Sequence, residues 1–415
     1  MRPMLRDSPY PMLPIEDAQR IIGEHTRLID SEEIDCCAML PTAPDGRVLA
    51  EDVYATETIP DVPKAAVDGY ALQVADNTNE RRVLAEIAAG MEQSPVVEPG
   101  TAVRIMTGAP IPQGADAVIM VEDTEERAGL LHVQRMVQQG QNIHVVGQDV
   151  AHGALVLACG TSLGAAEVGL LATIGRTRIA VARRPRVAVL STGDEVREPD
   201  LPREVGGIRD SNRYALLAAV REAGGEAISL GIARDDEQAQ RQAILRGLEQ
   251  ADVLLTSGGV SMGTRDLIKP LLSELGTVHF GRVLFKPGKP TTFATVQDTL
   301  VFGLPGYPVS SLVSFEVFVR PALRRMQGAI YPDRPRVQVT LCDTIKAAPD
   351  RPEYQRVIVR WEEGQLVAQS TGAQGSSRLL SLRAANALLL VPSGGQVYQA
   401  GDRLEALLVG SLVPS

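Results

Sequence analysis

Four short segments between residues 191 and 311 combine glycines with side chains that could do chemistry. In the first segment, STGDE, the hydroxyls of Ser191 and Thr192 can donate hydrogen bonds. The carboxylates of Asp194 and Glu195 can hold a cation or accept a proton. Ser, Thr and Asp also cap helices, so this segment alone does not choose between a ligand site and a structural cap.

The second segment, TSGGVSMGTRD at residues 256–266, lies between an apolar stretch and a predicted helix. Its glycines and small hydroxyl residues let backbone N–H groups converge on an anion, and the positive end of the next helix would add to this attraction. The GxxxxGK[ST] spacing of a P-loop is absent. This context favours phosphate binding over a plain flexible turn. The residues concerned are Ser257, Gly258, Gly259 and Ser261, with Asp266 near the helix start, where it could reach a bound metal.

In the third segment, FKPGKP, two lysines stand on a frame of prolines and glycine. Lys286 and Lys289 place two ammonium groups three residues apart, an arrangement that suits a polyanion. Solvated surface lysines are the common alternative, although lysines framed by prolines at a sheet edge are less usual.

The fourth segment, GLPGYPVSS, predicts a rigid corner between an apolar run and a helix. Pro308 suits the first helical position, because its missing N–H costs nothing there and its fixed φ is already helical. Gly306 permits a positive φ or the close approach of a ligand. A strand-to-helix turn without a ligand is the alternative, but the helix offers free N–H groups to an anion in either case.

Three further acidic residues precede turns or helices. Asp210 stands with Asn212 just before a predicted helix, where capping is the alternative to a site. Asp149 lies in a glycine-flanked turn, and Asp68 precedes Gly69 in a common turn dipeptide. Together with the loops above, these acids and lysines suit a phosphorylated ligand bound with Mg²⁺.

The periodicity of apolar residues predicts the elements that must position these loops. Helices are expected at residues 14–29 and 164–176, and short β-like runs fill residues 45–160. From 184 to 327, apolar strands alternate with helices, which predicts an open, mostly parallel, doubly wound sheet with ligands beyond the carboxyl ends of its strands. These helices are expected near residues 212–223, 235–249, 265–275 and 308–326. After Gly328 the β pattern returns and predicts a small C-terminal barrel or sandwich.

The composition of the whole chain sets broader limits. Its 415 residues predict two to four domains, and its net charge of −10 argues against a general nucleic-acid binder. No apolar stretch is long enough to cross a membrane, and the N-terminal sequence lacks the apolar core of a signal peptide. The four cysteines form no CxxC pair, which argues against a zinc site. We therefore expect a cytoplasmic protein with buried free thiols.

Taken in their order along the chain, the motifs resemble those of the molybdopterin molybdenumtransferases, the MoeA family, which includes the gephyrin E domain. The resemblance spans nearly the full chain, and its specificity comes from the combination of motifs. They are AAVDGYA, RIMTGAPIPQGADAVIMVED, VGQDV, STGDEV, IRDSNR, TSGGVSMGTRD, KPGKP and GLPGYPVSS.

The resemblance implies a multidomain fold of α/β and β parts. A doubly wound, mostly parallel α/β domain would bind molybdopterin, and an inserted β domain, an elongated N-terminal and central domain and a C-terminal β-barrel-like domain would complete the chain. The expected bounds are 1–50 with 141–182 for the elongated domain, 51–140 for the inserted domain, 183–327 for the α/β domain and 328–415 for the C-terminal domain. Family members are homodimers, so a partner subunit is expected to contribute to the active site.

The resemblance also implies a reaction in which adenylylated molybdopterin and molybdate give molybdenum cofactor and AMP, with Mg²⁺ as the cofactor. The implied catalytic residues are Asp68, Asp149, Glu195, Asp210, Lys286 and Lys289. The implied ligand-binding residues are Thr107, Ser257, Gly258, Gly259, Ser261, Pro305, Pro308 and Ser310, and the implied metal ligands are Asp266 and Glu195. Other proteins of molybdenum cofactor biosynthesis are implied partners, whereas nucleic acid and membranes are not.

Three positions depart from the family pattern. The family usually has Asn at the position of Tyr307, Ser-Ala-Met in place of residues 65–67, and often Glu at the position of Gln148. The acids and lysines are retained, so the chemistry is expected to be intact and the pocket tuned differently. Three alternatives stay open at this point: a tungsten-preferring paralogue, a non-catalytic pterin-binding or scaffold protein of the same fold, and a different Mg²⁺-dependent nucleotide or phosphoester enzyme.

Overall fold

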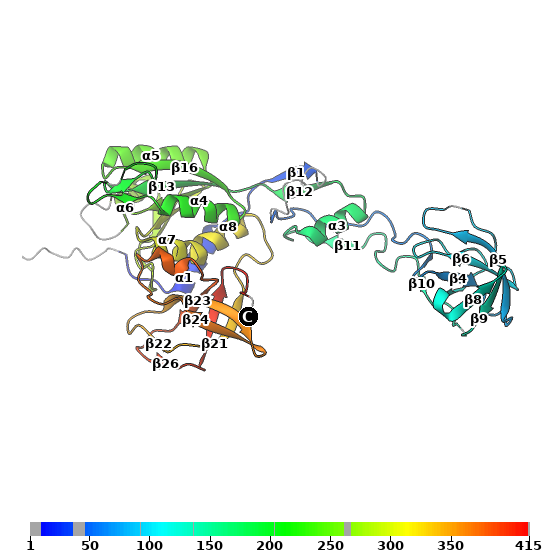
Figure 1. Ribbon diagram of the computed structural model, residues 1–415. Helices are drawn as coiled ribbons and strands as arrows, with labels where there is room; N and C mark the ends of the chain where they lie inside the picture. The colour runs from blue at the N-terminus through cyan, green and yellow to red at the C-terminus, as the bar shows by residue number, and fades with distance from the viewer. Residues whose placement is uncertain are drawn as a thin grey trace, which may run out of the picture. The chain divides into compact units, whose positions relative to one another are not determined.

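A computed structural model describes residues 10–35, 46–91, 93–135, 137–202, 204–260 and 267–413. The chain divides into two compact units, which we treat separately (Figure 1). The smaller unit comprises Asp52–Ala158 and Ala166–Thr177. The larger unit comprises the other described residues, including the whole stretch that begins at Arg178.

The larger unit is built around a six-stranded sheet, and this confirms the predicted doubly wound α/β fold. The strands lie in the order β16 (Glu226–Ala233), β13 (Arg186–Thr192), β17 (Val253–Ser257), β20 (Thr299–Leu304), β19 (Thr292–Val296) and β18 (Thr277–Phe280). The first four are parallel, while β19 runs antiparallel to both of its neighbours. Strand β19 was not predicted from the sequence, because this short strand directly follows the proline-rich lysine segment.

Both faces of this sheet are buried, as the apolar runs of its strands predict. Side chains alternate along β13, so that Val187 and Val189 enter one core cluster and Ala188 and Leu190 enter another. The first cluster also contains residues of helices α1 (Ile15–His25), α4 (Asn212–Glu222) and α7 (Pro308–Ser314). The second also contains residues of helices α5 (Glu237–Gln250) and α6 (Ile268–Leu275).

The helix expected at 308–326 is continuous but changes its winding in the middle. It consists of α7, the π-helical segment η3 (Phe315–Val319) and α8 (Arg320–Met326). Pro321 has no N–H to donate, so a regular α-helical bond to the Val317 carbonyl cannot form there. The Gln19 side chain in α1 donates to this carbonyl at 3.1 Å, which ties α1 to the helix where its hydrogen-bond pattern shifts. Helix α1 ends at His25, four residues before the predicted end.

The C-terminal part of the larger unit forms a closed five-stranded barrel. Of the two predicted architectures, a barrel or a sandwich, the barrel is therefore the correct one. The strands are β21 (Arg336–Leu341), β24 (Gln365–Ser370), β23 (Glu353–Glu362), β25 (Ala387–Val391) and β27 (Arg403–Leu408), with a small ribbon of β22 (Ile345–Lys346) and β26 (Val397–Tyr398) beside them. Val339, Val359 and Leu389 fill its core. Tyr354 and Leu388 instead join the core cluster beneath α4 and α7, so the barrel packs against the α/β part.

The remaining paired strands of the larger unit are short. Strand β1 (Ser31–Asp35) pairs with β12 (Arg178–Ala182), and β14 (Val196–Arg197) pairs with β15 (Ile208–Arg209). The one-turn helix η4 (Leu379–Leu382) follows the barrel strand β24. In the part of the chain that the structure describes, no helix is both long and apolar enough to span a membrane. The prediction of buried thiols is wrong for Cys159 and Cys342, which are exposed, and Cys36 and Cys37 lie outside the described residues.

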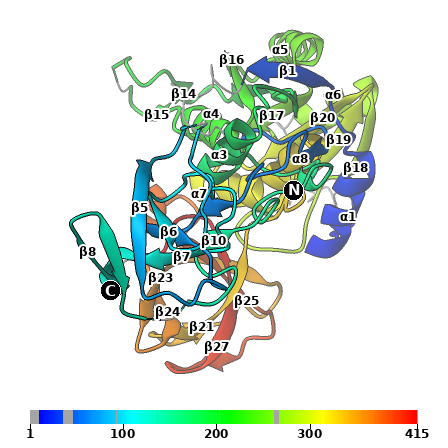
Figure 2. The ribbon, with the colours of Figure 1, turned by 90° about the vertical axis from the view of Figure 1, so that its right-hand side faces the viewer.

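The smaller unit is mainly β, as the sequence predicts for this region (Figure 2). Its sheet has the order β7 (Ala117–Met120), β4 (Gly69–Leu72), β6 (Thr101–Ile105), β5 (Glu80–Ile87), β9 (Leu130–Val133) and β8 (Thr124–Arg127), and η2 (Val121–Asp123) joins β7 to β8. Two core clusters cover its faces, one around Ala71 and Val103 and the other around Tyr70 and Ala102. The unit also holds β2 (Val53–Tyr54) with β11 (Leu155–Leu157), β3 (Lys64–Ala65) with β10 (Ile143–His144), and most of α3 (Ala165–Thr173).

Candidate active site

Two adjoining cavities in the larger unit gather most of the predicted site residues. The strand-end cavity, of about 510 Å³, lies at the carboxyl ends of β13, β17 and β20. The barrel-side cavity, of about 850 Å³, extends from the lysine segment to the barrel. The residues that line both cavities are Glu195, Ile208, Pro290, Pro305, Gly306 and Tyr307. The cavities therefore share a wall, and one extended ligand could occupy both.

Asn212, the first residue of α4, joins three loops around the strand-end cavity. Its Nδ2 donates to the hydroxyl of Ser257 and to the carbonyl of Gly306, both at 2.8 Å. The three loops leave different strands and would each be costly to order alone, because fixing a backbone residue costs roughly 1–2 kcal/mol. The partly buried amide of Asn212 thus holds the three loops in a common arrangement.

Glycines allow the loops to approach one another closely. A Cβ atom at Gly193 would lie 2.7 Å from a carboxylate oxygen of Glu195, and a Cβ atom at Gly258 would lie 2.8 Å from the Thr192 carbonyl. Gly258 and Gly259 have φ angles of 93° and 66°, which L-residues with side chains rarely adopt. Any larger residue at these positions would displace the lining of the cavity.

Glu195 is the acid that the site leaves available. Its side chain is exposed, it lines both cavities, and it has no hydrogen-bond or ion-pair partner among the residues with described positions. The carboxylate is therefore free to accept a proton or to bind a cation in either cavity. Asp235, which follows strand β16, is a second carboxylate that lines the strand-end cavity.

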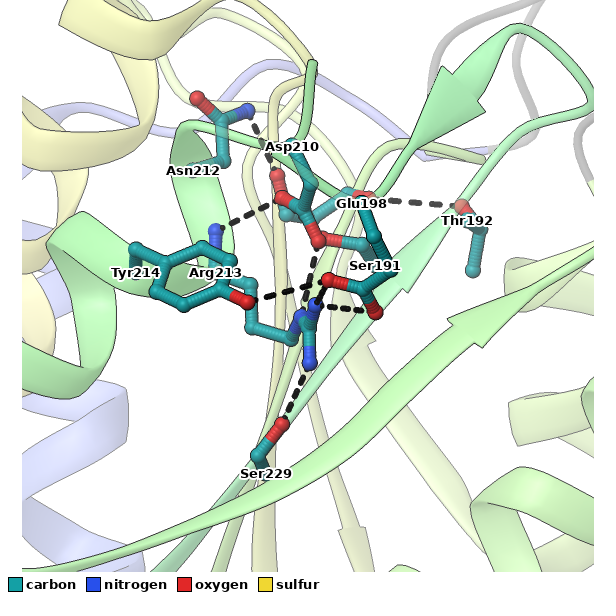
Figure 3. Close-up of polar contacts among 9 residues, drawn as sticks. Ser191, Thr192, Glu198, Asp210, Asn212, Arg213, Tyr214 and Ser229 are labelled. Carbon is teal, nitrogen blue, oxygen red and sulfur yellow. Dashed lines mark hydrogen bonds and ion pairs between the residues drawn. The ribbon is translucent and has the colours of Figure 1, made fainter. Parts of the chain in front are cut away.

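Asp210 has a different environment, because both of its carboxylate oxygens are occupied (Figure 3). One oxygen accepts from the Ser191 hydroxyl at 2.9 Å and from the Arg213 N–H at 3.0 Å, and the other accepts from Arg213 Nε at 2.8 Å. Its side chain is only 1% exposed. Asp210 therefore has the structural role that was the alternative to a ligand site, because it caps the first turn of α4 and ties it to the end of β13.

Arg213 extends this network away from the cavity (Figure 3). Its guanidinium also donates to the carboxylate of Glu198 and to the Ser229 hydroxyl, at 2.5 Å and 2.6 Å. Burial alone would lower the pKa of Arg213, but the hydrogen bonds and charges of Asp210 and Glu198 outweigh burial and raise it. The arginine therefore stays charged, and the network stays locked, over the whole physiological pH range.

The barrel-side cavity is positively charged. Lys286 lies 3.0 Å from the carboxylate of Glu353, which is 3% exposed, so part of its charge is balanced. The ammonium group of Lys289 has no partner within the described ranges. Arg351 adds a guanidinium to the same wall, and its Nε lies 3.5 Å from the carboxylate of Asp350. Three cations on one wall, with Lys289 unpaired among the described residues, favour a multiply charged anion here.

A barrel loop at residues 374–377 completes both cavities. Gln374, Gly375 and Ser376 line the barrel-side cavity, and Ser377 lines the strand-end cavity. The Ser376 carbonyl accepts from the N–H of Val309 at 3.1 Å, which occupies one of the free donors in the first turn of α7. The first turn of this helix is thus partly saturated by the barrel and less open to an anion than the sequence alone predicts.

The fully buried Arg356 fixes this loop through hydrogen bonds. Its guanidinium donates to Ser381 Oγ at 3.2 Å and to the Gly375 carbonyl at 3.4 Å. Its backbone N–H donates to the Gln374 side chain at 2.8 Å. Arg356 is therefore a positioning residue for a wall of the site, more than 40 residues away in sequence from the lysine segment.

Comparison with known protein families assigns every part of the chain that forms this site. Residues 13–175 match the MoeA N-terminal region (domain I and II), residues 188–325 match a probable molybdopterin binding domain, and residues 338–409 match the MoeA C-terminal region (domain IV). The molybdopterin molybdenumtransferase of Bacillus subtilis is 34% identical over 88% of this chain and 87% of that protein.

The chain belongs to the MoeA family.

Other relatives support the assignment. Molybdopterin molybdenumtransferase 2 of Mycobacterium tuberculosis is 36% identical over 93% of this chain and 98% of that protein. Gephyrin of Dictyostelium discoideum is 36% identical over 98% of this chain, which spans 64% of gephyrin's length. The crystal structure of a molybdopterin biosynthesis MoeA protein from Pyrococcus horikoshii has a TM-score of 0.82 and 31% identity, covering 96% of this chain and 100% of that one. The resemblance read from the motifs is confirmed.

In this MoeA-family chain, the predicted site residues fall into three described groups and a pair outside the described ranges. Those that line the strand-end cavity are Glu195, Asp210, Ser257, Gly258, Gly259, Pro305 and Pro308, and those on the barrel side include Lys286, Lys289 and Ser310. Asp68, Thr107 and Asp149 belong to the smaller unit. Ser261 and Asp266 lie outside the described residues.

Four features of the site were not predicted from the sequence: Asp235, Arg351 and the barrel loop, which line the cavities, and Glu353, which pairs with Lys286. Asp235 could have been found, because it follows a predicted strand of the sheet and so obeys the rule used for the other loops. The three barrel features carry no local motif, and only the fold brings them to the lysines.

In the smaller unit, the structure brings Asp68 and Thr107 together. One carboxylate oxygen of Asp68 accepts from both the backbone N–H and the hydroxyl of Thr107, at 2.7 Å each. These two bonds, the backbone one first, lower the pKa of Asp68. Asp149 is exposed, and its N–H donates to the Ile59 carbonyl in the turn that the sequence predicts.

We expect Thr107→Val to raise the pKa of Asp68 towards its ordinary value of about 3.9. The lowered folded-state pKa means that the contact stabilises the folded protein fully above about pH 4, and that this stabilisation is lost as the pH falls through the folded value. An NMR titration of the Asp68 carboxyl carbon measures the change. An unshifted titration midpoint in the variant would show that the hydroxyl contributes nothing, and Thr101→Val serves as a control elsewhere in the same sheet.

Proposed function

We propose that this MoeA-family chain is a molybdopterin molybdenumtransferase that converts adenylylated molybdopterin and molybdate into molybdenum cofactor and AMP. The observation that carries the proposal is the pair of joined cavities, with a free carboxylate at their shared wall and cations on one side. A ligand with two ring systems joined by a diphosphate has the elongated shape and negative charge that such a site would bind. The proposal includes a cytoplasmic homodimer.

The residues of the two cavities have different roles in this proposal. Ser257, Gly258 and Gly259 would cradle a phosphate at the carboxyl end of β17, while Lys286 and Lys289 would bind the anionic groups on the barrel side, with Arg351 beside them. Glu195 would be the proton acceptor or cation ligand between them. Asp210 would act through Arg213 by positioning α4. The walls of the pocket would be formed by Pro305, Pro308 and Ser310, and the predicted sites of the smaller unit are Asp68, Thr107 and Asp149.

The residues present fit Mg²⁺, which the family resemblance implies. Among the residues that the structure describes there is no cluster of three or more His, Cys, Asp or Glu side chains that could hold a metal by itself. Mg²⁺ is usually bound by one or two carboxylates together with substrate phosphates and water, and Glu195 with Asp235 supplies two carboxylates in the strand-end cavity. When bound there, the ion would neutralise charge on the phosphoanhydride as it breaks.

The proposal is tested by measuring AMP release from adenylylated molybdopterin by the purified protein. We expect release to require both an oxyanion and Mg²⁺, with molybdate and tungstate offered in parallel and the metal in the product analysed. A preference for tungstate would support the paralogue alternative. An absence of turnover with either oxyanion, while a B. subtilis relative assayed in parallel is active, would overturn the proposal.

We expect Lys289→Met to raise the KM for molybdate about tenfold or more, because hydrogen bonds to charged groups contribute about 1.5–3 kcal/mol. Lys289 is the cleaner test than Lys286, since removing Lys286 would also leave the buried carboxylate of Glu353 without its cation. The increase should shrink at high salt, because salt screens the wild-type attraction. Lys346→Met, at an exposed site on the barrel, is the matched control. A KM equal to that of this control would remove Lys289 from the anion site.

A further inference from the structure

We propose that the ring of Tyr307 is a stacking platform for a flat heterocycle of the substrate. This inference rests on the proposed function, because it assigns a binding role within the same two cavities. It also answers what a tyrosine does in the rigid corner between β20 and α7.

The first observation is the place of the ring. Tyr307 lines both cavities and is 61% exposed. The barrel-side cavity has one other aromatic lining residue in the described part of the chain, Phe285, which is fully buried in the core. Tyr307 is thus the aromatic face that a ligand in either cavity can reach.

The second observation is that the backbone beneath the ring is fixed. The Gly306 carbonyl accepts from Asn212 at 2.8 Å, and the Tyr307 carbonyl accepts from the N–H of Ser311 at 2.9 Å. The ring of Pro308 fixes its own φ at a helical value and favours, in the residue before it, the extended conformation that Tyr307 adopts, with φ −75° and ψ 131°. Stacking of a ligand on the ring therefore costs little conformational free energy, because the backbone is already ordered.

The third observation is that the protein makes no other use of this side chain. The phenol oxygen has no hydrogen-bond partner in the described ranges, and the ring takes part in no aromatic pair there. An exposed apolar ring that stabilises neither the core nor a network is available for a ligand. Stacked aromatic pairs contribute about twofold to tenfold in affinity beyond the area that they bury.

The proposed substrate carries two flat heterocycles, the pterin and the adenine, on opposite sides of its diphosphate. Either could stack on a ring at the wall between two cavities, and the shared chemistry is that of a planar conjugated ring with polar edges. Binding experiments with the two halves of the substrate distinguish the sources. AMP carries only the adenine, and molybdopterin that has not been adenylylated carries only the pterin.

The test measures the Kd of AMP by calorimetry and the Kd of molybdopterin by quenching of pterin fluorescence, for the wild type and for Tyr307→Phe, Tyr307→Leu and Tyr307→Asn. We expect the Phe variant to bind like the wild type, and the Leu and Asn variants to bind one of the two ligands about twofold to tenfold more weakly. The ligand that is affected identifies the stacked ring. Tyr331→Asn, at a tyrosine that is 86% exposed and lines neither cavity, is the matched control.

Three outcomes would overturn the inference. Unchanged Kd values for both ligands in the Leu and Asn variants would exclude stacking while leaving the proposed function intact. A Phe variant as weak as the Asn variant would assign the role to the hydroxyl and not to the ring. A wild-type protein that binds neither ligand would overturn the proposed function, and the stacking role with it.

Discussion

Glu195→Gln is expected to lower kcat for AMP release by about 10²–10⁴-fold, the usual contribution of a positioned acid–base group. The substitution keeps the size of the side chain and removes its negative charge and its basicity. Because the carboxylate has no protein partner among the described residues, its loss should leave folding almost unaffected. The measurement is kcat at saturating substrate, together with the melting temperature of each protein.

The matched control is Glu222→Gln, at an exposed position on α4 outside both cavities. This variant should keep the wild-type rate and melting temperature. A Glu195→Gln variant that retains more than about a tenth of the wild-type kcat would show that the carboxylate is not used in the reaction. A supplement of Mg²⁺ that restores its rate would identify Glu195 as a cation ligand and not as a proton acceptor.

Asp210→Ala is expected to destabilise the larger unit by about 3 kcal/mol. Removing one partner of a buried ion pair costs about 3–5 kcal/mol, because the other charge stays buried without compensation. The lower end of that range applies here, since Glu198 still pairs with Arg213 from a side chain that is 36% exposed. The shift in the urea midpoint, followed by far-UV circular dichroism, measures the loss.

Two comparisons make this prediction specific. Asp210→Asn keeps an acceptor for the Arg213 N–H and should therefore lose less stability than the alanine variant. Asp200→Ala removes an exposed carboxylate nearby and should change nothing measurable. Equal urea midpoints for Asp210→Ala and Asp200→Ala would contradict the structural role of Asp210, and would return it to the set of acids available for chemistry.

Much of the fold could be predicted because it depends on local sequence patterns, such as apolar runs and the positions of prolines. The unbroken apolar runs of β13, β17 and β20 predict a sheet with both faces covered, and the core clusters on its two faces confirm this. The loops that follow these strands meet at one cavity because parallel strands present their carboxyl ends at the same edge. Pro308 lies at the first position of α7, as its fixed φ predicts.

The limits of prediction lie where chemistry depends on distant partners. In the sequence Lys286 and Lys289 are indistinguishable, whereas in the structure Glu353 pairs with Lys286 and Lys289 has no partner among the described residues. The acids Glu195 and Asp210 are similarly alike in sequence, but a buried arginine occupies both oxygens of the second. No local spacing contains this information, because the deciding contacts depend on tertiary structure.

The bond between the Val309 N–H and the Ser376 carbonyl bears on how this chain can be engineered. A chain truncated at Gly328 would keep all six strands of the central sheet and would still lack a wall of each cavity. A chimera that exchanges the C-terminal barrel between two relatives would likewise transplant part of the pocket along with it. The barrel therefore cannot be removed without loss of part of the site. In such exchanges, we expect the chimera to acquire part of the substrate preference of the relative that supplies the barrel.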